Sequence, residues 1–306
     1  MISIQSLENK INEEELEYEA RDEIILLGEA AEKKKRELSF ERYDTGMTFF
    51  DDSAKLENEQ GGIAGGELLI ISAPTGNGKT TLAATISYHL LKNVHLPGLW
   101  FTYEVSVYQL WKVFERMGGA KDDIVCVPAD HTTGKLEWVE KKIFEAKQKY
   151  DVKYVVIDHL GFLAPFQKMN QNMTQNYSSY LGQICRELKT IAVRENIFII
   201  LPVHMVKSAS DDPSLRDIGY SGGIAQEADF VILIAREEVK KDSLNIQPNS
   251  YYTERTKVSL AKNRVGGSTP TWWMSMEDGK LKTIFVDYEE EKLRKKVWKK
   301  KELFTA

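Results

Sequence analysis

The most informative segment of the chain reads Leu68-Leu-Ile-Ile-Ser-Ala-Pro-Thr-Gly-Asn-Gly-Lys-Thr80. Its aliphatic residues predict a buried strand, and the apolar positions from Leu82 to Leu91 predict a helix directly after the glycine-bearing loop. Backbone N–H groups at the start of a helix bind phosphate, and the helix dipole favours negative charge there. The segment therefore predicts a P-loop that binds a nucleotide, although Ala73 stands where the general pattern has glycine.

Seven consecutive residues are the candidate nucleotide ligands. The Lys79 ammonium is expected to neutralise the β- and γ-phosphates of ATP, and the Thr80 hydroxyl is expected to bind Mg²⁺. Backbone N–H groups of the loop would surround the β-phosphate. The candidates are Thr75, Gly76, Asn77, Gly78, Lys79, Thr80 and Thr81.

Two carboxylates end other apolar runs. Asp158 follows Tyr154-Val-Val-Ile157, and a carboxylate at the tip of a buried strand beside a P-loop is suited to hold Mg²⁺. Glu104 follows Phe101-Thr-Tyr103, where it could orient the attacking water and accept its proton. A turn aspartate and an exposed glutamate that begins a helix are the alternative interpretations.

Short apolar runs alternate with longer helical stretches along the chain. Apolar runs between helices are buried on both faces of a sheet. This pattern predicts an α/β fold with a mainly parallel central sheet flanked by helices. The expected strands are 68–71, 99–103, 124–127, 154–157, 197–203, 230–235 and 257–261, and the expected helices are 82–91, 108–117, 136–150 and 177–194.

The composition narrows the class of protein. The 306 residues are 42% hydrophobic, which suffices for one sizeable core, and no apolar stretch approaches the ~18 residues of a membrane span. A net charge of −5 gives no overall basic footprint for nucleic acid, but a local basic channel stays compatible with it. Cys126 and Cys185 lie far apart and indicate reduced thiols, and no signal-peptide pattern is visible. We therefore expect an intracellular, soluble protein.

With these residues placed, the stretch from about 45 to 284 resembles the RecA-like motor of hexameric replicative DNA helicases, the DnaB-like family with its phage primase-helicase relatives. The segment that ends in Glu104 is similar to the family's strand with the catalytic glutamate. Ile157-Asp158-His159-Leu160 is similar to its Walker B segment, and Pro202-Val-His204 is similar to its sensor strand. The resemblance implies that His204 contacts the γ-phosphate.

Later segments carry further implied roles. Residues 221–229 resemble the helix that couples nucleotide state to a DNA loop, with Gln226 as the coupling residue, and Arg236 matches an arginine near the nucleotide base. Ala261-Lys262-Asn-Arg264-Val-Gly266 is similar to the segment that reaches into the next subunit's site. The resemblance implies that Arg264 is an arginine finger acting in trans, with Lys262 beside it. Taken alone, both side chains are more typical of solvated charges.

The family's two central DNA-binding loops correspond to about 165–178 and 206–221. The first is polar with one lysine and the second holds Lys207 and Arg216, so that amide and backbone groups would share the phosphate contacts. Where the family has an arginine after an Asp-Leu pair, this chain has Asp217-Ile218-Gly219, which leaves the individual contacts open. The candidate DNA-binding residues are Lys168, Lys207, Arg216 and Gly219.

The two ends of the chain differ from its middle. In 8–38, apolar residues recur every three or four positions, which predicts a helix that packs on its own domain or on a neighbouring subunit. The lysine-rich end is typical of a solvated helix or of a DNA-binding arm. We expect an N-terminal linker helix in 1–44, an ATPase domain in 45–288 and a basic tail in 289–306.

The resemblance implies an ATP-dependent replicative helicase that translocates on single-stranded DNA and unwinds duplex, in the cytoplasm of a bacterial or phage-infected cell. Its implied partners are further copies of the chain in a hexameric ring, the replication fork and a separate primase. Two other functions share the same phosphate site. One is a RecA/RadA-like recombination or repair ATPase, which forms filaments, and the other is a helicase-derived loader or scaffold that binds nucleotide without turnover.

Overall fold

The computed structural model describes residues 26–30, 32, 41–55, 60–130, 135–163, 173–205, 213–218, 221–239 and 251–284. The chain divides into two compact units, Met1–Phe40 and Glu41–Ala306. In the first unit, residues 27–30 and 32 are helical and Leu26 and Leu27 are exposed. The rest of the predicted linker helix and the lysine-rich tail lie outside the described residues.

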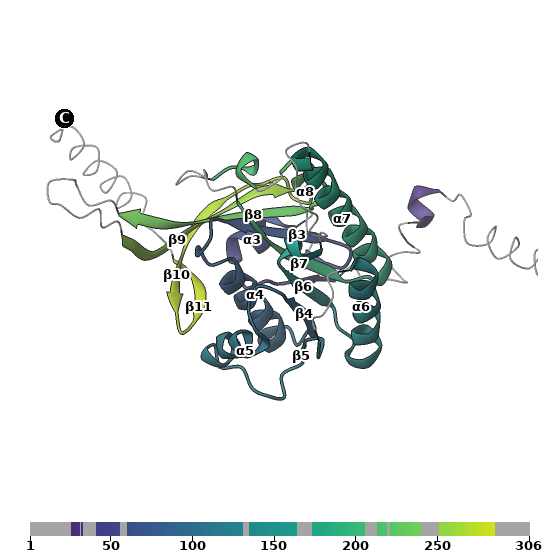
Figure 1. Cartoon of the computed structure of the whole chain (residues 1–306), viewed down its shortest axis with the longest axis horizontal. Helices are drawn as coiled ribbons and strands as arrows, with labels where there is room; N and C mark the ends of the chain where they lie inside the picture. The colour runs from purple at the N-terminus through teal and green to yellow at the C-terminus, as the bar shows by residue number, and fades with distance from the viewer. Residues whose placement is uncertain are drawn as a thin grey trace, which may run out of the picture. The chain divides into compact units, whose positions relative to one another are not determined.

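The second unit is built on a nine-stranded sheet of described residues, in the order β11-β10-β9-β8-β3-β7-β6-β4-β5 (Figure 1). The six strands β8, β3, β7, β6, β4 and β5 are parallel to one another. The pairs β8–β9, β9–β10 and β10–β11 are antiparallel. A small antiparallel pair, β1 (Arg42–Tyr43) and β2 (Ile63–Ala64), lies outside this sheet. The strands of the large sheet are β3 (Leu68–Ala73), β4 (Gly98–Thr102), β5 (Val125–Cys126), β6 (Tyr154–Asp158), β7 (Phe198–His204), β8 (Phe230–Val239), β9 (Tyr251–Asn263), β10 (Thr271–Glu277) and β11 (Lys280–Ile284).

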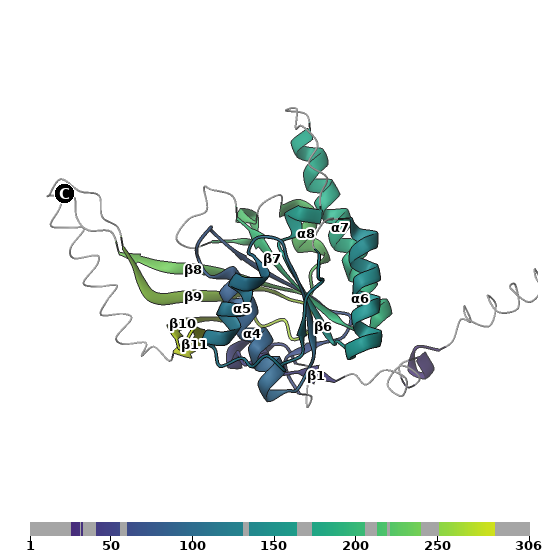
Figure 2. The same cartoon turned by 60° about the horizontal axis from the view of Figure 1, so that its bottom comes forward.

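Helices cover both faces of the sheet, because alternate residues of each buried strand point to opposite sides. In β3, Leu69 and Ile71 pack with α3 (Thr48–Ser53), α4 (Lys79–Asn93) and α5 (Val107–Arg116). Leu68 and Ile70 of the same strand join the core on the other face. That face is covered by α6 (Leu136–Tyr150), α7 (Met173–Glu195) and α8 (Ser221–Glu227), of which α6 and α7 lie side by side (Figure 2).

Each fully buried aliphatic side chain of these two cores stabilises the fold by about 1.5–3 kcal/mol. Two short 3₁₀ helices, η1 (Leu160–Leu163) and η2 (Leu215–Asp217), follow β6 and β7 along the chain. The predicted α/β class with a mainly parallel sheet is confirmed. None of the described helices is both long and apolar enough to cross a membrane.

The structure corrects the expected strands in two places. The run 124–127 forms a strand at Val125–Cys126 only. The strand expected at 257–261 extends over Tyr251–Asn263, and a hairpin of β10 and β11, which was not predicted, follows it. Asp278 and Gly279 both have positive φ, the conformation of a tight two-residue turn. The hairpin supports the P-loop helix, because the Leu281 N–H donates to Thr85 Oγ1 at 3.1 Å.

The strand register defines two edges of the sheet. We call the edge at the ends of β3, β4, β6 and β7 the carboxyl edge; there Ala73 pairs with His204 and Thr102 with Asp158. We call the opposite edge, where β3 and β8 begin, the amino edge. Because β9 runs antiparallel to β8, its end returns to the amino edge, and Asn263 pairs with Phe230.

Candidate nucleotide site

The P-loop lies at the carboxyl edge, between β3 and α4. Gly76 and Gly78 have φ of 78° and 91°, a backbone conformation that strains any residue with a Cβ. Apart from its two chain neighbours, no described atom lies within 4 Å of the place where a Gly76 Cβ would stand, so the loop borders open space there. Asn77 fixes the loop, because its Oδ1 accepts the Arg236 N–H at 2.8 Å and its Nδ2 donates to Thr75 O at 3.3 Å.

Lys79 begins α4, and its side chain is buried below the loop. Only 5% of the residue is exposed, and Nζ donates to the carbonyl of Ala73 at 3.4 Å. Burial lowers the pKa of Lys79, whereas the carboxylates of Glu104 and Asp158 act in the opposite direction. A buried ammonium with one long hydrogen bond retains bonding capacity for an anion, as a triphosphate site requires.

Asp158 ends β6 and meets the first turn of α4. Its Oδ2 accepts the Thr80 hydroxyl at 2.7 Å, while its buried Oδ1 has no partner among the described residues. Burial raises the pKa of Asp158 to about 6. Hard oxygen donors of this kind fit Mg²⁺, and the unpartnered Oδ1 leaves room for a bond to a water of its hydration shell.

Glu104, His159 and His204 converge beside this pair, at the tips of β4, β6 and β7. The His204 Nε2 lies 3.6 Å from Glu104 Oε2, and one ligand atom from each of the three residues lies within 4.8 Å of the others. The two imidazole rings meet edge to face with centroids 4.6 Å apart. Burial lowers the pKa of both histidines, so both rings are mainly neutral at pH 7.

Backbone hydrogen bonds fix the segment that carries the Glu104 carboxylate. The N–H groups of Tyr103 and Glu104 both donate to the Asp158 carbonyl, at 2.7 and 3.2 Å. Aromatic rings support His159, because Phe162 stacks on Tyr103 with centroids 5.3 Å apart and contacts the His159 ring at 5.1 Å. The Glu104 side chain itself is exposed toward solvent. An exposed carboxylate beside a neutral imidazole can accept a proton from a water molecule.

Lys262, Arg264 and Gln226 lie together at the amino edge, apart from Lys79. Lys262 Nζ donates to the carbonyls of Ala225 and Gln226 at 2.7 and 2.9 Å, and the Arg264 guanidinium also donates to the Gln226 carbonyl. Both cations thus bind the last turn of α8. The Arg264 backbone N–H donates to the Asp229 carbonyl, and the Asp229 N–H donates to the carbonyl of Leu68 at the start of β3. The six residues of β3 separate this edge from the P-loop by about 17 Å.

The structure describes only some of the remaining predicted site residues. Arg236 in β8 lies beside the P-loop through its bond to Asn77. Arg216 is exposed on η2, and Thr81 lies in the first turn of α4. Lys168, Lys207 and Gly219 lie outside the described residues, as do most of the two predicted DNA-binding loops.

Two residues of interest were not among the predicted site residues. His159 was noted only as part of the Walker B-like segment, and its position directly after Asp158 was the available signal. Asp229 is buried at the amino edge, where it accepts bonds from the Leu68 N–H at 2.8 Å and from Lys189 at 2.5 Å. It lies 3.6 Å from the Arg264 guanidinium. Asp229 is the last residue of the family-like segment 221–229, but its three partners come from distant parts of the chain, so spacing does not predict them.

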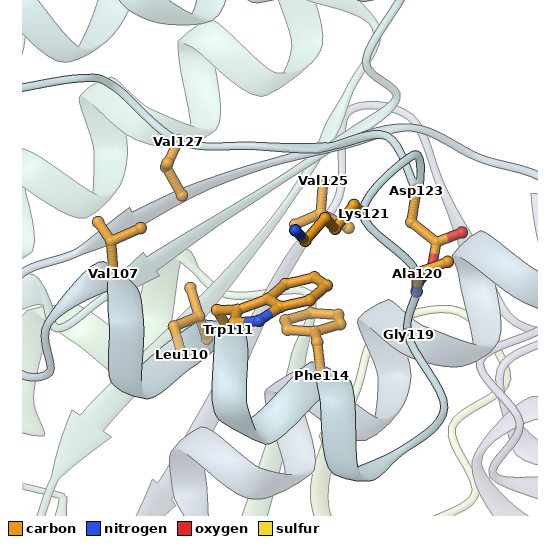
Figure 3. A pocket seen from close by; sticks show the side chains of 10 residues that line it. All are labelled: Val107, Leu110, Trp111, Phe114, Gly119, Ala120, Lys121, Asp123, Val125 and Val127. Carbon is orange, nitrogen blue, oxygen red and sulfur yellow. Dashed lines mark hydrogen bonds between the residues drawn. The ribbon is translucent and has the colours of Figure 1, made fainter.

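A separate hollow of about 140 Å³ lies between α5 and β5 (Figure 3). Its lining is mostly apolar, with Leu110, Trp111 and Phe114 on the helix and Val125 and Val127 facing them. None of the predicted nucleotide or DNA ligands that the structure describes lines it. It is therefore distinct from the nucleotide site at the carboxyl edge.

Comparison with known proteins identifies similar chains. The model of the DnaB-like helicase C terminal domain matches residues 115–277, more than half of the chain. The replicative DNA helicase DnaB of Mycoplasma pneumoniae is 27% identical over 238 residues, which cover 66% of this chain and 49% of the relative. That of Helicobacter pylori is 30% identical over 214 residues, which cover 60% and 42%. The chain thus spans about half the length of the curated relatives it matches.

A solved structure described as a DnaB-like replicative helicase and its interactions with primase has the same fold. It matches with a TM-score of 0.64 at 18% identity, over 92% of this chain and 72% of that chain. The family model begins after the P-loop and Glu104, so the roles of these residues depend on the geometry described above.

Proposed function

Since the chain belongs to the DnaB-like helicase C terminal domain family, we propose that it is the ATP-hydrolysing motor of a ring-forming replicative DNA helicase. The relatives that it matches are named replicative DNA helicases. In this proposal the chain binds Mg²⁺-ATP at its carboxyl edge and moves along single-stranded DNA to unwind duplex inside the cell.

The observation that carries the proposal is the separation of Lys79 from Arg264. Both are expected to contact one triphosphate, yet they lie at opposite edges of the sheet in the same chain. The strand β3 lies between them, and its residues are buried. An arginine finger at the amino edge can reach a nucleotide only on another copy of the chain, which favours a head-to-tail assembly.

The residues of the carboxyl edge divide the chemistry among them. Lys79 and the N–H groups of the P-loop would hold the phosphates, and Thr80 with Asp158 would hold Mg²⁺, which supplies charge neutralisation when bound. Glu104 would orient a water molecule and accept its proton, while the neighbouring His204 Nε2 would contact the γ-phosphate. Arg264 of the next copy would stabilise the charge of the transition state.

The DNA and protein partners follow from the same proposal. A hexameric ring would bring copies of the two predicted loops and Arg216 to a central channel, where polar groups bind DNA phosphates. The structure with a TM-score of 0.64 is described as interacting with primase, and we propose a primase as a partner of this chain too. DNA-stimulated ATP hydrolysis and unwinding of a forked duplex are the expected activities.

A subunit-mixing experiment tests the carrying observation. Lys79→Ala should lose nucleotide binding but keep its Arg264, whereas Arg264→Ala should keep binding but lose the finger. Each variant alone is expected to be inactive. In an equimolar mixture, about one interface in four would combine an intact P-loop with an intact finger, so ATPase activity should return.

Absence of recovery, although mass spectrometry shows mixed assemblies, would contradict the trans arrangement. Electron micrographs of the same sample separate the alternatives, since rings support the helicase and helical filaments support a recombination ATPase. Binding of ATP without turnover in wild-type rings with DNA would favour a loader or scaffold.

A further inference from the structure

The proposed ATPase chemistry uses Glu104 and His204 but gives no role to His159, whose imidazole faces both of them. Two imidazoles and one carboxylate face one another across three neighbouring strands, with one ligand atom from each within 4.8 Å. This donor set is selective for transition metal ions, because imidazole nitrogen suits Zn²⁺, Co²⁺, Ni²⁺ and Fe²⁺ while Mg²⁺ prefers oxygen donors. The neighbouring Thr80 and Asp158 offer only oxygen.

We propose that Glu104, His159 and His204 form a reversible binding site for a divalent transition metal ion, with Zn²⁺ as the representative ligand. The site is separate from the Mg²⁺ position at Thr80 and Asp158. The proposal goes beyond the motor function and does not depend on it, because the binding belongs to the nucleotide-free protein.

The distances are close to those of a zinc centre. Zinc lies about 2.0–2.2 Å from nitrogen and oxygen ligands, so two ligand atoms on one tetrahedral ion are about 3.3–3.5 Å apart. His204 Nε2 and Glu104 Oε2 are already 3.6 Å apart. The other two separations, from His159 to Glu104 and from His159 to His204, are at most 4.8 Å. Rotation of the exposed Glu104 side chain can shorten the first, and the second requires a small movement of the imidazole rings toward each other.

The surroundings of the rings favour reversible over permanent binding. His159 Nδ1 accepts the Gly161 N–H at 3.0 Å, so the proton of the neutral ring is on Nε2. A metal ion can therefore bind the ring only if the hydrogen bond from Gly161 to Nδ1 is lost. Ligating histidines usually donate their second N–H to a carbonyl or carboxylate. His204 Nδ1 is buried and has no such partner among the described residues.

Occupation of this site has a chemical consequence. A carboxylate bound to a metal ion is a poorer proton acceptor, so Zn²⁺ on Glu104 would stop it from activating water. With three protein ligands, a zinc ion keeps a fourth position open for water or a phosphate oxygen. Inhibition of ATP hydrolysis by Zn²⁺ that excess Mg²⁺ does not relieve is therefore expected.

Direct metal binding is the decisive test. The nucleotide-free protein is titrated with Zn²⁺ against a fluorescent chelator in excess Mg²⁺, and with Co²⁺ to record its visible absorption. We expect about one ion per chain, with the absorption of four- or five-coordinate Co²⁺. His159→Gln, His204→Gln and Glu104→Gln should each weaken binding by at least the roughly 10- to 100-fold that loss of an outer partner costs.

Matched controls exclude other sites. His89→Gln removes a histidine that pairs with Asp44 at 3.2 Å, and Cys126→Ser removes the more exposed thiol; neither should change the affinity. Asp158→Asn should keep the Co²⁺ absorption, because the Mg²⁺ position is separate. Circular dichroism confirms the folding of each variant. Unchanged Zn²⁺ affinity in both folded histidine variants, or loss of the Co²⁺ absorption in Asp158→Asn, would overturn the proposal.

Discussion

The carboxyl and amino edges of the sheet hold their charges in different ways. At the carboxyl edge, Lys79 and Asp158 are buried and keep unused bonding capacity, since Asp158 Oδ1 has no partner among the described residues. At the amino edge, Lys262 and Arg264 are more exposed and bind the carbonyls at the end of α8. The first arrangement is costly without a ligand, whereas the second is stable as it stands.

This difference is consistent with the proposal that each chain contributes parts of two different sites. Buried groups with spare capacity indicate a ligand that enters the same chain. Exposed cations on carbonyl oxygens can exchange those oxygens for phosphate oxygens of a neighbour at little cost, because both are oxygen acceptors.

The largest effect is expected for Arg264→Ala. Loss of an arginine finger lowers kcat by about 10³–10⁵-fold, while nucleotide binding by Lys79 of the same chain should persist. Steady-state ATPase assays and equilibrium binding of a fluorescent ATP analogue measure the two quantities. The matched control is Arg186→Ala, since Arg186 is an exposed arginine that binds Glu227 of the same α8. Equal turnover in wild type and Arg264→Ala would remove the amino edge from catalysis.

Glu104→Gln should have the next largest effect. A glutamine cannot accept the proton of the attacking water, so kcat should fall by about 10²–10⁴-fold while nucleotide affinity stays within a few-fold. Single-turnover hydrolysis separates the chemical step from binding. Glu115→Gln is the control, because Glu115 is a glutamate ion-paired with Lys112 on α5. A normal single-turnover rate in Glu104→Gln would exclude Glu104 as the base.

Protonation of Asp158 should have an effect of intermediate size, and this effect should have opposite signs for Mg²⁺-nucleotide affinity and for stability. Its pKa is raised to about 6, so Mg²⁺-nucleotide affinity should fall roughly tenfold per pH unit below that value as the carboxylate protonates. The free energy of unfolding changes in the opposite direction. Because the pKa of Asp158 is raised in the folded state, the contribution of this group to stability is fully present below the unfolded value of 3.8 and is lost as pH rises through about 6.

Urea unfolding and Mg²⁺-nucleotide titrations at pH 5 and 7 measure both trends. Asp158→Asn should remove the difference between the two pH values that this group causes, while other titrating groups contribute equally to both proteins. If the wild type and Asp158→Asn show the same pH dependence, the carboxyl group is ionised across this range.

The smallest effect is expected from Asn77→Ala. It removes the bond between Asn77 Oδ1 and the Arg236 N–H and should cost about 1 kcal/mol in nucleotide affinity, because the loop loses its link to β8. At the amino edge, where β9 ends, Asn263→Ala removes bonds to the carbonyls of Ser53 and Ser268. It should lower the free energy of unfolding but leave nucleotide affinity in the isolated chain unchanged. Isothermal titration calorimetry and urea unfolding distinguish the two.

The sequence predicted the parallel part of the sheet well because those strands are buried on both faces. Aliphatic runs such as the one in β3 have no soluble alternative to burial. The β10–β11 hairpin was missed because only alternate residues, such as Trp272 and Met274, are buried, which gives a weaker signal. The pair Asp278-Gly279 between the two strands is a recognised turn signal that would have identified it.

The sequence predicted a site residue only where the local pattern around that residue was enough to identify it. Lys79, Thr80 and Asp158 follow from local patterns, and the structure brings them together. The contact of His159 with His204 depends on the adjacency of β6 and β7, which spacing along the chain does not reveal. The assignment of Arg264 came from family resemblance, because two cations at a strand end have no distinctive local pattern.

The bond from Leu281 to Thr85 has a consequence for the order in which the protein matures. The helix that carries Lys79 is synthesised early, but it also packs against β7 and β11, and Leu281 of β11 follows Thr85 by nearly 200 residues. A nascent chain still on the ribosome therefore has a P-loop helix whose face toward the hairpin is uncovered. Competence to bind nucleotide should consequently appear late in translation, after β11 has left the ribosomal tunnel.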